Sequence, residues 1–574
     1  MHYFVPHRFA IAATALCGLL TVWSSLTLPY IMRLVIEDLE NETLTPERLW
    51  RRIGLFIAVG TVAIIFSRLI RKIPLKLSHM IEYELRNDLF EHLTRLDQSF
   101  YRRERTGDLM TKLSSDINII RDAIGQGLLQ GSRTLIALIS AAVVMLMTDR
   151  QLTEIIFSIF APMSLIFFLV LRFLRRHQLA LQEHVSEVSN YCHETFSGIR
   201  CLKGFALERR RNSDFEALNS ELIRKTMRMQ RSRQLLWPFV DFCFSVGTIL
   251  TFIVGGKRII EGTLTIGTLM QFIQYLAFLR WPLLALSFVT SMVQRGKVSW
   301  IRVKDILDTQ PEIAEPNAEA LPSEKPKASI RFRNVDVEIG GQRLLKEINL
   351  DIPMGTTLGI TGPTGSGKTL MTSLVARLLD PTRGEVLLDG KDLRTLPLRA
   401  LRGMIGYAAQ EPVLFSRTLE HNIGFGIDDP DMGTIGWAAD IAHLHGDIET
   451  FPDRYQTILG ERGVTLSGGQ RQRTSISRAI ARRPDILILD DVLSAVDTQT
   501  EAAIMKKLQP VMAERTTLFV SHRVSTLRYS DEIVVIENGR ITQHGTHEEL
   551  IQVPGYYAEL NTMQQLQEKL EADE

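Results

Sequence analysis

Gly362-Pro363-Thr364-Gly365-Ser366-Gly367-Lys368-Thr369 reads G-x-x-x-x-G-K-[ST], the pattern of a phosphate-binding P-loop. The preceding residues 357–361 are mainly apolar or β-branched and predict a buried strand, and apolar side chains recur at helical spacing over 370–379. Strand, loop and helix in this order are the context that the motif requires. We therefore expect the glycines to let the backbone wrap a phosphate, with free N–H groups and a helix N-terminus supplying positive potential.

Two side chains at the end of this loop would complete the phosphate site. Lys368 would reach the β- and γ-phosphates, and the Thr369 hydroxyl would hold Mg²⁺. The alternative is a chance glycine turn, and a match of this kind arises by chance in roughly a few per cent of chains of this length. The flanking strand and helix make chance a weaker explanation, so the motif predicts ATP and Mg²⁺ as ligands.

Composition sets bounds on the whole chain. Its 574 residues indicate two or more domains, and its net charge of +1 argues against a nucleic-acid-binding protein. Long apolar runs are confined to the first half, whereas the second half is typical of a soluble α/β domain. The first half also holds all the cysteines, which lack metal-ligand spacing and are predicted to be free thiols: Cys17, Cys192, Cys201 and Cys243.

The apolar runs predict transmembrane helices. Residues 9–36 are apolar for long enough to cross a bilayer, and the run is too long for a secretory signal and lacks its cleavage site. Further candidates bring the prediction to about six spans. They are 53–77, 121–147, 152–173, 235–258 and 268–293.

The connecting segments predict the orientation. The loop after the first span is acidic, whereas the stretches between spans two and three and between spans four and five are rich in arginine. Basic loops stay cytoplasmic, so both termini should lie inside. Helical patterning over 81–96 and 179–196 indicates that the helices continue well beyond the bilayer.

Three charged residues lie within or beside the predicted spans: Arg68, Asp241 and Arg280. Charges are costly in lipid and often line a transport pathway. The alternative is that they lie near the cytoplasmic ends, where they snorkel or pair and only shape the helices. The sequence leaves both interpretations open.

A proline-rich stretch at 308–328 predicts a linker, and strand-like alternation follows it at 329–337 and 345–352. Downstream, Leu466-Ser467-Gly468-Gly469-Gln470 opens a helix that continues to Ile480. Ser467 and the two glycines would present a helix N-terminus and bare amides, a second anion site in the same half of the chain.

These motifs and their order resemble the ABC transporter family over nearly the whole chain. Further matching segments are 406–412 around Gln410 (Q-loop), 460–463 (X-loop), 486–490 ending in Asp490 (Walker B), 494–497 (D-loop) and His522 after the strand 517–520. Each is weak alone. Together and in this order they leave little room for a purely structural explanation.

The resemblance implies a role for each residue. Gln410 would sense the γ-phosphate and contact the membrane half, Asp490 would act on Mg²⁺ through water, and His522 would contact the γ-phosphate. Thr369 and Gln410 would share the metal with Asp490. The signature Ser467–Gln470 of one nucleotide-binding domain would close over ATP held by the P-loop of another.

The first half resembles the six-helix exporter type of membrane domain. Segments 105–109 and 197–200 match the surroundings of the two coupling helices of such exporters. The implied fold is a helical membrane domain joined to an α/β P-loop domain with a helical subdomain. The expected divisions are 1–307 (membrane domain), 308–328 (linker), 329–565 (ABC domain) and 566–574 (tail).

The sequence departs from the family in two places. Asp491 stands where hydrolytic members carry a catalytic glutamate, and general-base action is worth about 10²–10⁴-fold in rate. The shorter carboxylate predicts an impaired site, although a backbone adjustment or an extra water could compensate. Ile339 stands near the position at which the family carries an aromatic residue that stacks on adenine. Without that aromatic ring, ATP binding loses roughly 1–3 kcal/mol of stacking.

These features predict a half-size exporter subunit in a bacterial cytoplasmic membrane that works with a second, different half-transporter. An intact signature beside a poor base is what such a heterodimer subunit should carry. By resemblance, the cargo would be a drug, a lipid or another small amphipathic molecule. The alternatives are export of a defined metabolite, peptide or thiol, and an ATP-gated channel or regulator. No nucleic-acid partner is expected.

Overall fold

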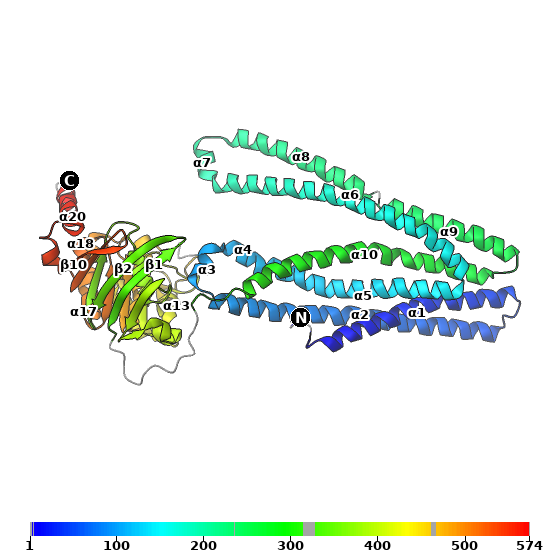
Figure 1. The fold of residues 1–574 in the computed structure, drawn as a ribbon, viewed down its shortest axis with the longest axis horizontal. Helices are drawn as coiled ribbons and strands as arrows, with labels where there is room; N and C mark the ends of the chain where they lie inside the picture. The colour runs from blue at the N-terminus through cyan, green and yellow to red at the C-terminus, as the bar shows by residue number, and fades with distance from the viewer. Residues whose placement is uncertain (1–2, 4, 235, 314–327, 461–465, 573–574) are drawn as a thin grey trace. The chain divides into compact units, whose positions relative to one another are not determined.

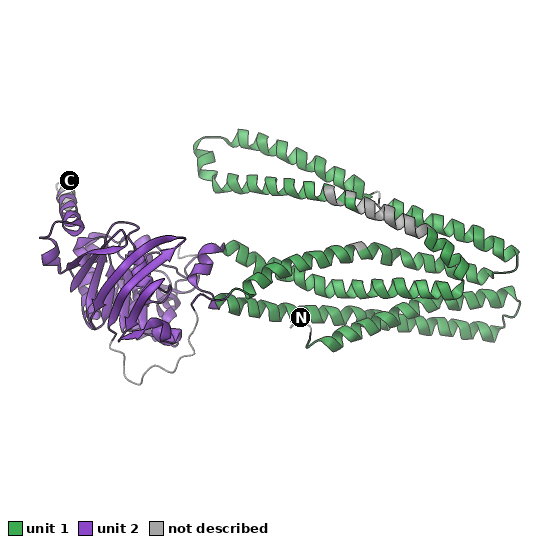
Figure 2. Ribbon diagram, in the orientation of Figure 1, with its two compact units in different colours: residues 1–94, 106–309 green, residues 95–105, 310–574 purple. Residues whose placement is uncertain are grey.

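The computed structural model describes residues 3, 5–234, 236–313, 328–460 and 466–572. The described chain forms two compact units (Figure 2). Unit 1 contains residues 1–94 and 106–309, and unit 2 contains 95–105 and 310–574. Unit 1 is helical and unit 2 is built on β-sheets (Figure 1).

Unit 1 is formed by long helices. They are α1 (Arg8–Glu40), α2 (Pro46–Arg95), α5 (Ile117–Thr148), α6 (Arg150–Ser197), α8 (Glu208–Gln234), α9 (Leu236–Ile260) and α10 (Ile266–Leu307). Short helices connect them: α4 (Thr106–Thr111), the π-helical turn η2 (Lys112–Asp116) and α7 (Ile199–Gly204). α2 and α6 run without a break through 81–95 and 179–196, which confirms that these helices continue past the apolar runs.

Five helical stretches among the described residues are long and apolar enough to cross a membrane. They contain the predicted spans 9–36, 53–77, 121–147, 235–258 and 268–293. The remaining prediction, 152–173, falls within α6, and its side chains at 159–171 and at 173 lie outside the described ones. The total number of spans therefore stays a prediction.

Two contacts join helices within unit 1, one between α5 and α10 and one between α9 and α10. α5 and α10 approach closely, because a Cβ on Gly296 would lie 2.3 Å from the Ala123 Cβ. Asp241 of α9 forms an ion pair with Arg280 of α10, so these two charges neutralise each other within the unit. Of the two interpretations left open by the sequence, this contact favours a charge pair for Asp241 and Arg280.

Unit 2 contains two sheets. The four-stranded sheet has the order β2-β1-β4-β5, with β1 (Ile330–Ile339) antiparallel to β2 (Gln342–Ile352) and to β4 (Arg383–Leu388). Its last strand, β5 (Lys391–Asp392), pairs antiparallel with β4. The six-stranded sheet has the order β10-β9-β3-β8-β7-β6. Its strands are β3 (Thr357–Thr361), β6 (Ile405–Ala408), β7 (Ile486–Asp490), β8 (Thr516–Val520), β9 (Glu532–Glu537) and β10 (Arg540–Gly545).

The six-stranded sheet separates two hydrophobic cores. Ile486 and Ile488 of β7 face the core that includes β1 and β2, whereas Leu487 and Leu489 face a core built with helices α14 (Met432–Ile441), α16 (Gly468–Ala481) and α17 (Thr498–Ala513). Successive strand residues point to opposite faces, so a continuous apolar run serves both cores. This confirms an α/β domain with a helical part beside it.

The helix after the P-loop is shorter than predicted. α11 spans Lys368–Val375 rather than continuing to residue 379. Arg377 adopts a left-handed backbone (φ 46°), and the Leu378 N–H bonds back to the Ser373 carbonyl at 2.9 Å. This is the pattern of a helix C-terminal cap, which apolar periodicity alone does not reveal.

Candidate nucleotide site

Parallel pairing brings four sequence motifs to one edge of the six-stranded sheet. β3, β8, β7 and β6 are neighbours and run parallel, so their carboxyl ends share an edge. The P-loop follows β3, His522 follows β8, Asp490 ends β7 and Gln410 follows β6. Loops at the carboxyl edge of a parallel sheet are where such folds bind ligands.

The P-loop glycines take conformations that other residues avoid. Gly362, Gly365 and Gly367 have φ values of 144°, 79° and 107°. A Cβ on Gly362 would also lie 2.1 Å from the Ile536 carbonyl oxygen, so the loop packs against its neighbouring strand only with glycine there. The loop leads directly into α11, whose N-terminal amides are available to an anion.

The Lys368 ammonium folds back over this loop. It donates to the Gly362 and Pro363 carbonyls at 2.9 and 2.8 Å. Burial lowers the pKa of Lys368, and the nearby Asp491 and Asp490 carboxylates oppose that effect. A half-buried cation beside a glycine loop would gain a stronger partner in a phosphate.

Two of the three residues predicted to hold Mg²⁺, Thr369 and Asp490, fit the ion, whereas Gln410 bonds to Asp491. The Thr369 hydroxyl donates to Asp490 Oδ1 at 3.3 Å, and Asp490 Oδ2 is buried without a hydrogen-bond partner among the described residues. Burial and the neighbouring Asp491 raise the pKa of Asp490. A cation would satisfy the orphaned oxygen, and Mg²⁺ is commonly held by one carboxylate together with substrate phosphates and water.

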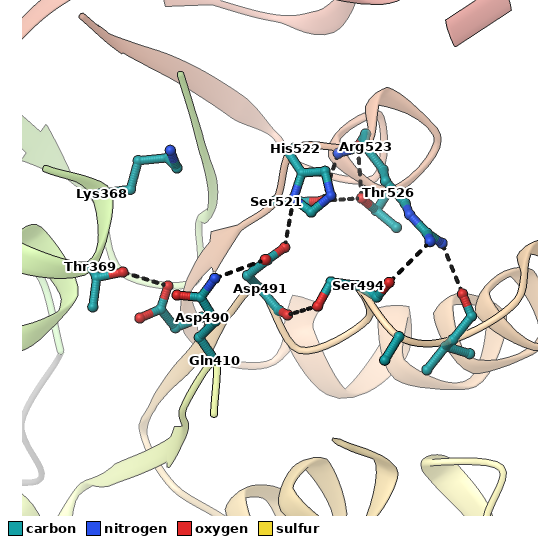
Figure 3. Close-up of polar contacts among 12 residues, drawn as sticks. Lys368, Thr369, Gln410, Asp490, Asp491, Ser494, Ser521, His522, Arg523 and Thr526 are labelled. Atoms are coloured by element: carbon teal, nitrogen blue, oxygen red, sulfur yellow. Dashed lines mark hydrogen bonds and ion pairs between the residues drawn. The ribbon is translucent and has the colours of Figure 1, made fainter. Parts of the chain in front are cut away.

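Asp491 lies between two of the predicted site residues (Figure 3). Its Oδ1 is 2.9 Å from His522 Nδ1, and its Oδ2 accepts from Gln410 Nε2 at 3.3 Å. The hydrogen bond that the His522 imidazole donates to the Asp491 carboxylate raises the pKa of His522. The structure thus joins Gln410 of the Q-loop and His522 through the carboxylate of Asp491, the residue after the Walker B strand.

The backbone of Asp491 is left-handed, with φ 51°. Aspartate tolerates this region better than most residues with a side chain, because its short polar group can bond locally. The left-handed backbone therefore suits an aspartate, whose two carboxylate oxygens meet His522 and Gln410.

The signature begins helix α16 as predicted. Ser467 and Gln470 form a capping box: Ser467 Oγ accepts from the Gln470 N–H at 3.2 Å, and Gln470 Oε1 accepts from the Ser467 N–H at 3.0 Å. Gln470 also donates to Asp447 at 3.2 Å. Among the described hydrogen bonds, none joins this capping box to the P-loop residues, so one unit holds the two anion-binding elements separately.

Two residues that the sequence analysis did not single out hold the loop 494–497. Gln472 donates to Ser494 Oγ at 2.8 Å and accepts from the Ala495 N–H at 2.9 Å. Arg523, beside His522, donates to the Ser494 and Val496 carbonyls at 3.3 and 3.0 Å (Figure 3). The available signal was a glutamine placed on the buried face of an amphipathic helix.

Two further predictions concern Ile339 and the X-loop. Ile339 ends β1 and packs partly buried against the core, beside a turn at Gly340 and Gly341 that has positive φ values. Its role toward adenine stays a prediction. The X-loop segment 460–463 lies outside the described residues from 461 onward.

Comparisons with known proteins decide the family. A model described as "ABC transporter transmembrane region" matches residues 9–283, and a model described as "ABC transporter" matches residues 345–494. The chain belongs to the ABC transporter family. Because it carries one membrane region and one ABC domain, it is a half-size exporter, a multi-pass membrane protein that must dimerise.

Similar proteins match along almost the full length of this ABC transporter. An ATP-dependent lipid A-core flippase of Desulfotalea psychrophila (strain LSv54 / DSM 12343) is 34% identical over 514 residues, 89% of each chain. A putative multidrug export ATP-binding/permease protein of Staphylococcus aureus (strain NCTC 8325 / PS 47) is 32% identical, with 99% of each chain covered. The solved structure of a bacterial Atm1-family ABC exporter with ATP bound has a TM-score of 0.81 and 25% identity over 97% of this chain and 98% of that chain.

Proposed function

We propose that this ABC transporter exports small amphipathic molecules, lipids or drugs, as one subunit of a heterodimer whose other subunit supplies the faster ATP site. The observation that carries this proposal is the position of Asp491. Its carboxylate is short, its backbone is left-handed, and both of its oxygens are engaged by His522 and Gln410.

The mechanism assigns each group a task. Lys368 and the P-loop amides would bind the β- and γ-phosphates, while Thr369, Gln410 and Asp490 would hold Mg²⁺, which neutralises developing phosphate charge when bound. His522 would donate to the γ-phosphate. Asp491 would accept a proton from the attacking water, and it does so poorly because its carboxylate is retracted and already hydrogen-bonded.

The signature, unlike Asp491, keeps the features that an ATP site needs. Ser467 is fixed by its capping box, and Gly468 and Gly469 leave the amides of α16 uncovered by side chains. In a dimer with crossed sites, this helix N-terminus would complete the partner's ATP site. The subunit would thus contribute an intact signature to the partner's ATP site and a weak general base to its own.

The cargo and location rest on similarity and on charge distribution. Relatives with near full-length coverage are named for a lipid A-core flippase and for multidrug export, which supports an amphipathic cargo. The basic stretches between the second and third predicted spans and between the fourth and fifth support a cytoplasmic ABC domain in a bacterial inner membrane, with both termini inside.

Transport by inverted membrane vesicles tests this proposal. With the partner half-transporter present, Mg²⁺ and ATP should drive uphill accumulation of a fluorescent amphipathic dye or lipid. A non-hydrolysable ATP analogue should not, because closure without turnover cannot reset the cycle. Equilibration down a gradient with the analogue alone would contradict a pump and indicate an ATP-gated channel.

A further inference from the structure

A side chain from the last helix bonds to the backbone on both sides of His522. Gln564 of α20 (Tyr556–Ala572) donates from Nε2 to the His522 carbonyl at 2.7 Å, and its Oε1 accepts from the Val524 N–H at 2.8 Å. A carbonyl only accepts and an N–H only donates, so the two partners fix the orientation of the amide.

The segment that Gln564 holds lies between regular elements. β8 ends at Val520 and helix α18 (Val524–Leu527) begins four residues later. His522 therefore has neither a sheet ladder nor a helix turn to define its backbone. The Gln564 amide supplies the equivalent of two backbone hydrogen bonds at this gap.

The helix that carries Gln564 is anchored. Tyr557 is fully buried, and its hydroxyl lies 2.8 Å from His547 Nδ1. Leu560 packs against a cluster that contains Val524 and Leu527 of α18. Tyr557, Leu560 and Gln564 are spaced i, i+3 and i+7, so they lie on one face of α20. The anchored turn presents the glutamine at a set distance from His522.

We propose that Gln564 is a positioning residue for His522, so that the C-terminal helix controls how the histidine meets the nucleotide. This inference rests on the proposed contact between His522 and the γ-phosphate. Gln564 bonds to the backbone at 522, and Asp491 Oδ1 lies 2.9 Å from Nδ1 of the imidazole. The neighbouring residues have other bonds, because the Ser521 N–H donates to the Ile360 carbonyl at 3.1 Å and the Arg523 N–H donates to Ser521 Oγ at 3.0 Å. Loss of the amide would remove the bonds that Gln564 makes to the His522 carbonyl and the Val524 N–H, and would loosen the backbone at His522 itself.

The test measures discrimination between ATP and ADP at this chain's own site. The full-length transporter in lipid nanodiscs is photolabelled with 8-azido-ATP and Mg²⁺. Unlabelled ATP or ADP is added as a competitor, and only the label attached to this chain is measured. Gln564→Leu replaces the amide with a slightly shorter apolar side chain and removes both hydrogen bonds. We expect it to lower the preference for ATP over ADP about three- to tenfold, as loss of a hydrogen bond does.

Gln565 supplies the matched control. It is the adjacent glutamine on the same helix and is exposed, so Gln565→Leu should leave the preference and the thermal unfolding temperature unchanged. Gln564→Glu keeps the acceptor for the Val524 N–H but lacks the donor to His522, and it should also lower the preference. An equal preference in Gln564→Leu and Gln565→Leu would overturn the inference.

A double substitution separates positioning from general stability. On a His522→Ala background, Gln564→Leu should have no further effect on the preference, because the group that it positions is gone. A further loss of similar size would overturn the inference by showing that Gln564 acts elsewhere. If His522→Ala alone leaves the preference for ATP over ADP unchanged, the proposed γ-phosphate contact of His522 is overturned. If His522→Ala lowers the preference but the Gln564 variants do not, that contact stands and the positioning role of Gln564 is overturned.

Discussion

The Ser467→Arg substitution should reduce the steady-state ATPase activity of the assembled transporter by about a hundredfold or more, the loss expected when a preorganised donor is removed from a phosphate site. Ser467 starts α16 and is fixed by Gln470, so a long cationic side chain there would cover the helix N-terminus that serves the partner's ATP. The measurement is phosphate release by the purified pair at saturating ATP.

A second capping box in the same domain provides the control for loss of a helix cap as such. Thr546 and Glu549 form a capping box of the same kind at the start of α19 (His547–Leu550), away from the signature. Thr546→Arg removes that cap at a cost of about 0.5–2 kcal/mol and should leave turnover close to normal. If Thr546→Arg lowers ATPase as much as Ser467→Arg, the loss reflects stability and the signature assignment is unsupported.

The Lys368→Ala substitution should weaken ATP binding at this chain's own site about 10- to 100-fold, because a charge-assisted hydrogen bond to phosphate is lost. The half-buried ammonium bonds to the P-loop carbonyls at 2.8 and 2.9 Å and would exchange them for phosphate oxygens. Photolabelling of this chain by 8-azido-ATP, with the partner's site disabled, reports the affinity.

Membrane insertion should be unaffected by this change, because the apolar helices lie in a separate unit of the structure. Lys391→Ala, at an exposed lysine on β5 (Lys391–Asp392), is the matched control and should bind ATP normally. Unchanged labelling of the Lys368→Ala chain would contradict the assignment of the P-loop.

Local sequence patterns predicted the parts of the nucleotide site that depend on short segments. The strand before the P-loop was predicted at 357–361 and is β3 over the same residues. The helix at the signature was predicted to reach Ile480 and ends at Ala481. Strong motifs succeed here because a tight glycine turn, a buried strand and a capped helix are each encoded within a few residues.

Contacts between distant segments could not be predicted in the same way. Gln564 lies 42 residues from His522, and Gln472 lies 22 residues from Ser494. Each pairs with backbone or hydroxyl groups, which every residue type offers, so no sequence pattern marks the partner. The early end of α11 has the same origin, since the left-handed backbone at Arg377 follows from packing rather than propensity.

Asp491→Asn, in the purified pair, tests the division of labour between the two ATP sites most directly. Asparagine keeps the size of the side chain and also tolerates a left-handed backbone. The substitution removes the charge of the base and leaves one acceptor oxygen where His522 and Gln410 now meet two. We expect steady-state ATPase to fall far less than the roughly 10²–10⁴-fold that removal of a working general base costs. Nucleotide occupancy of this chain should remain. A loss of activity as complete as that of Ser467→Arg would show that Asp491 is a working base and would contradict the asymmetric transporter.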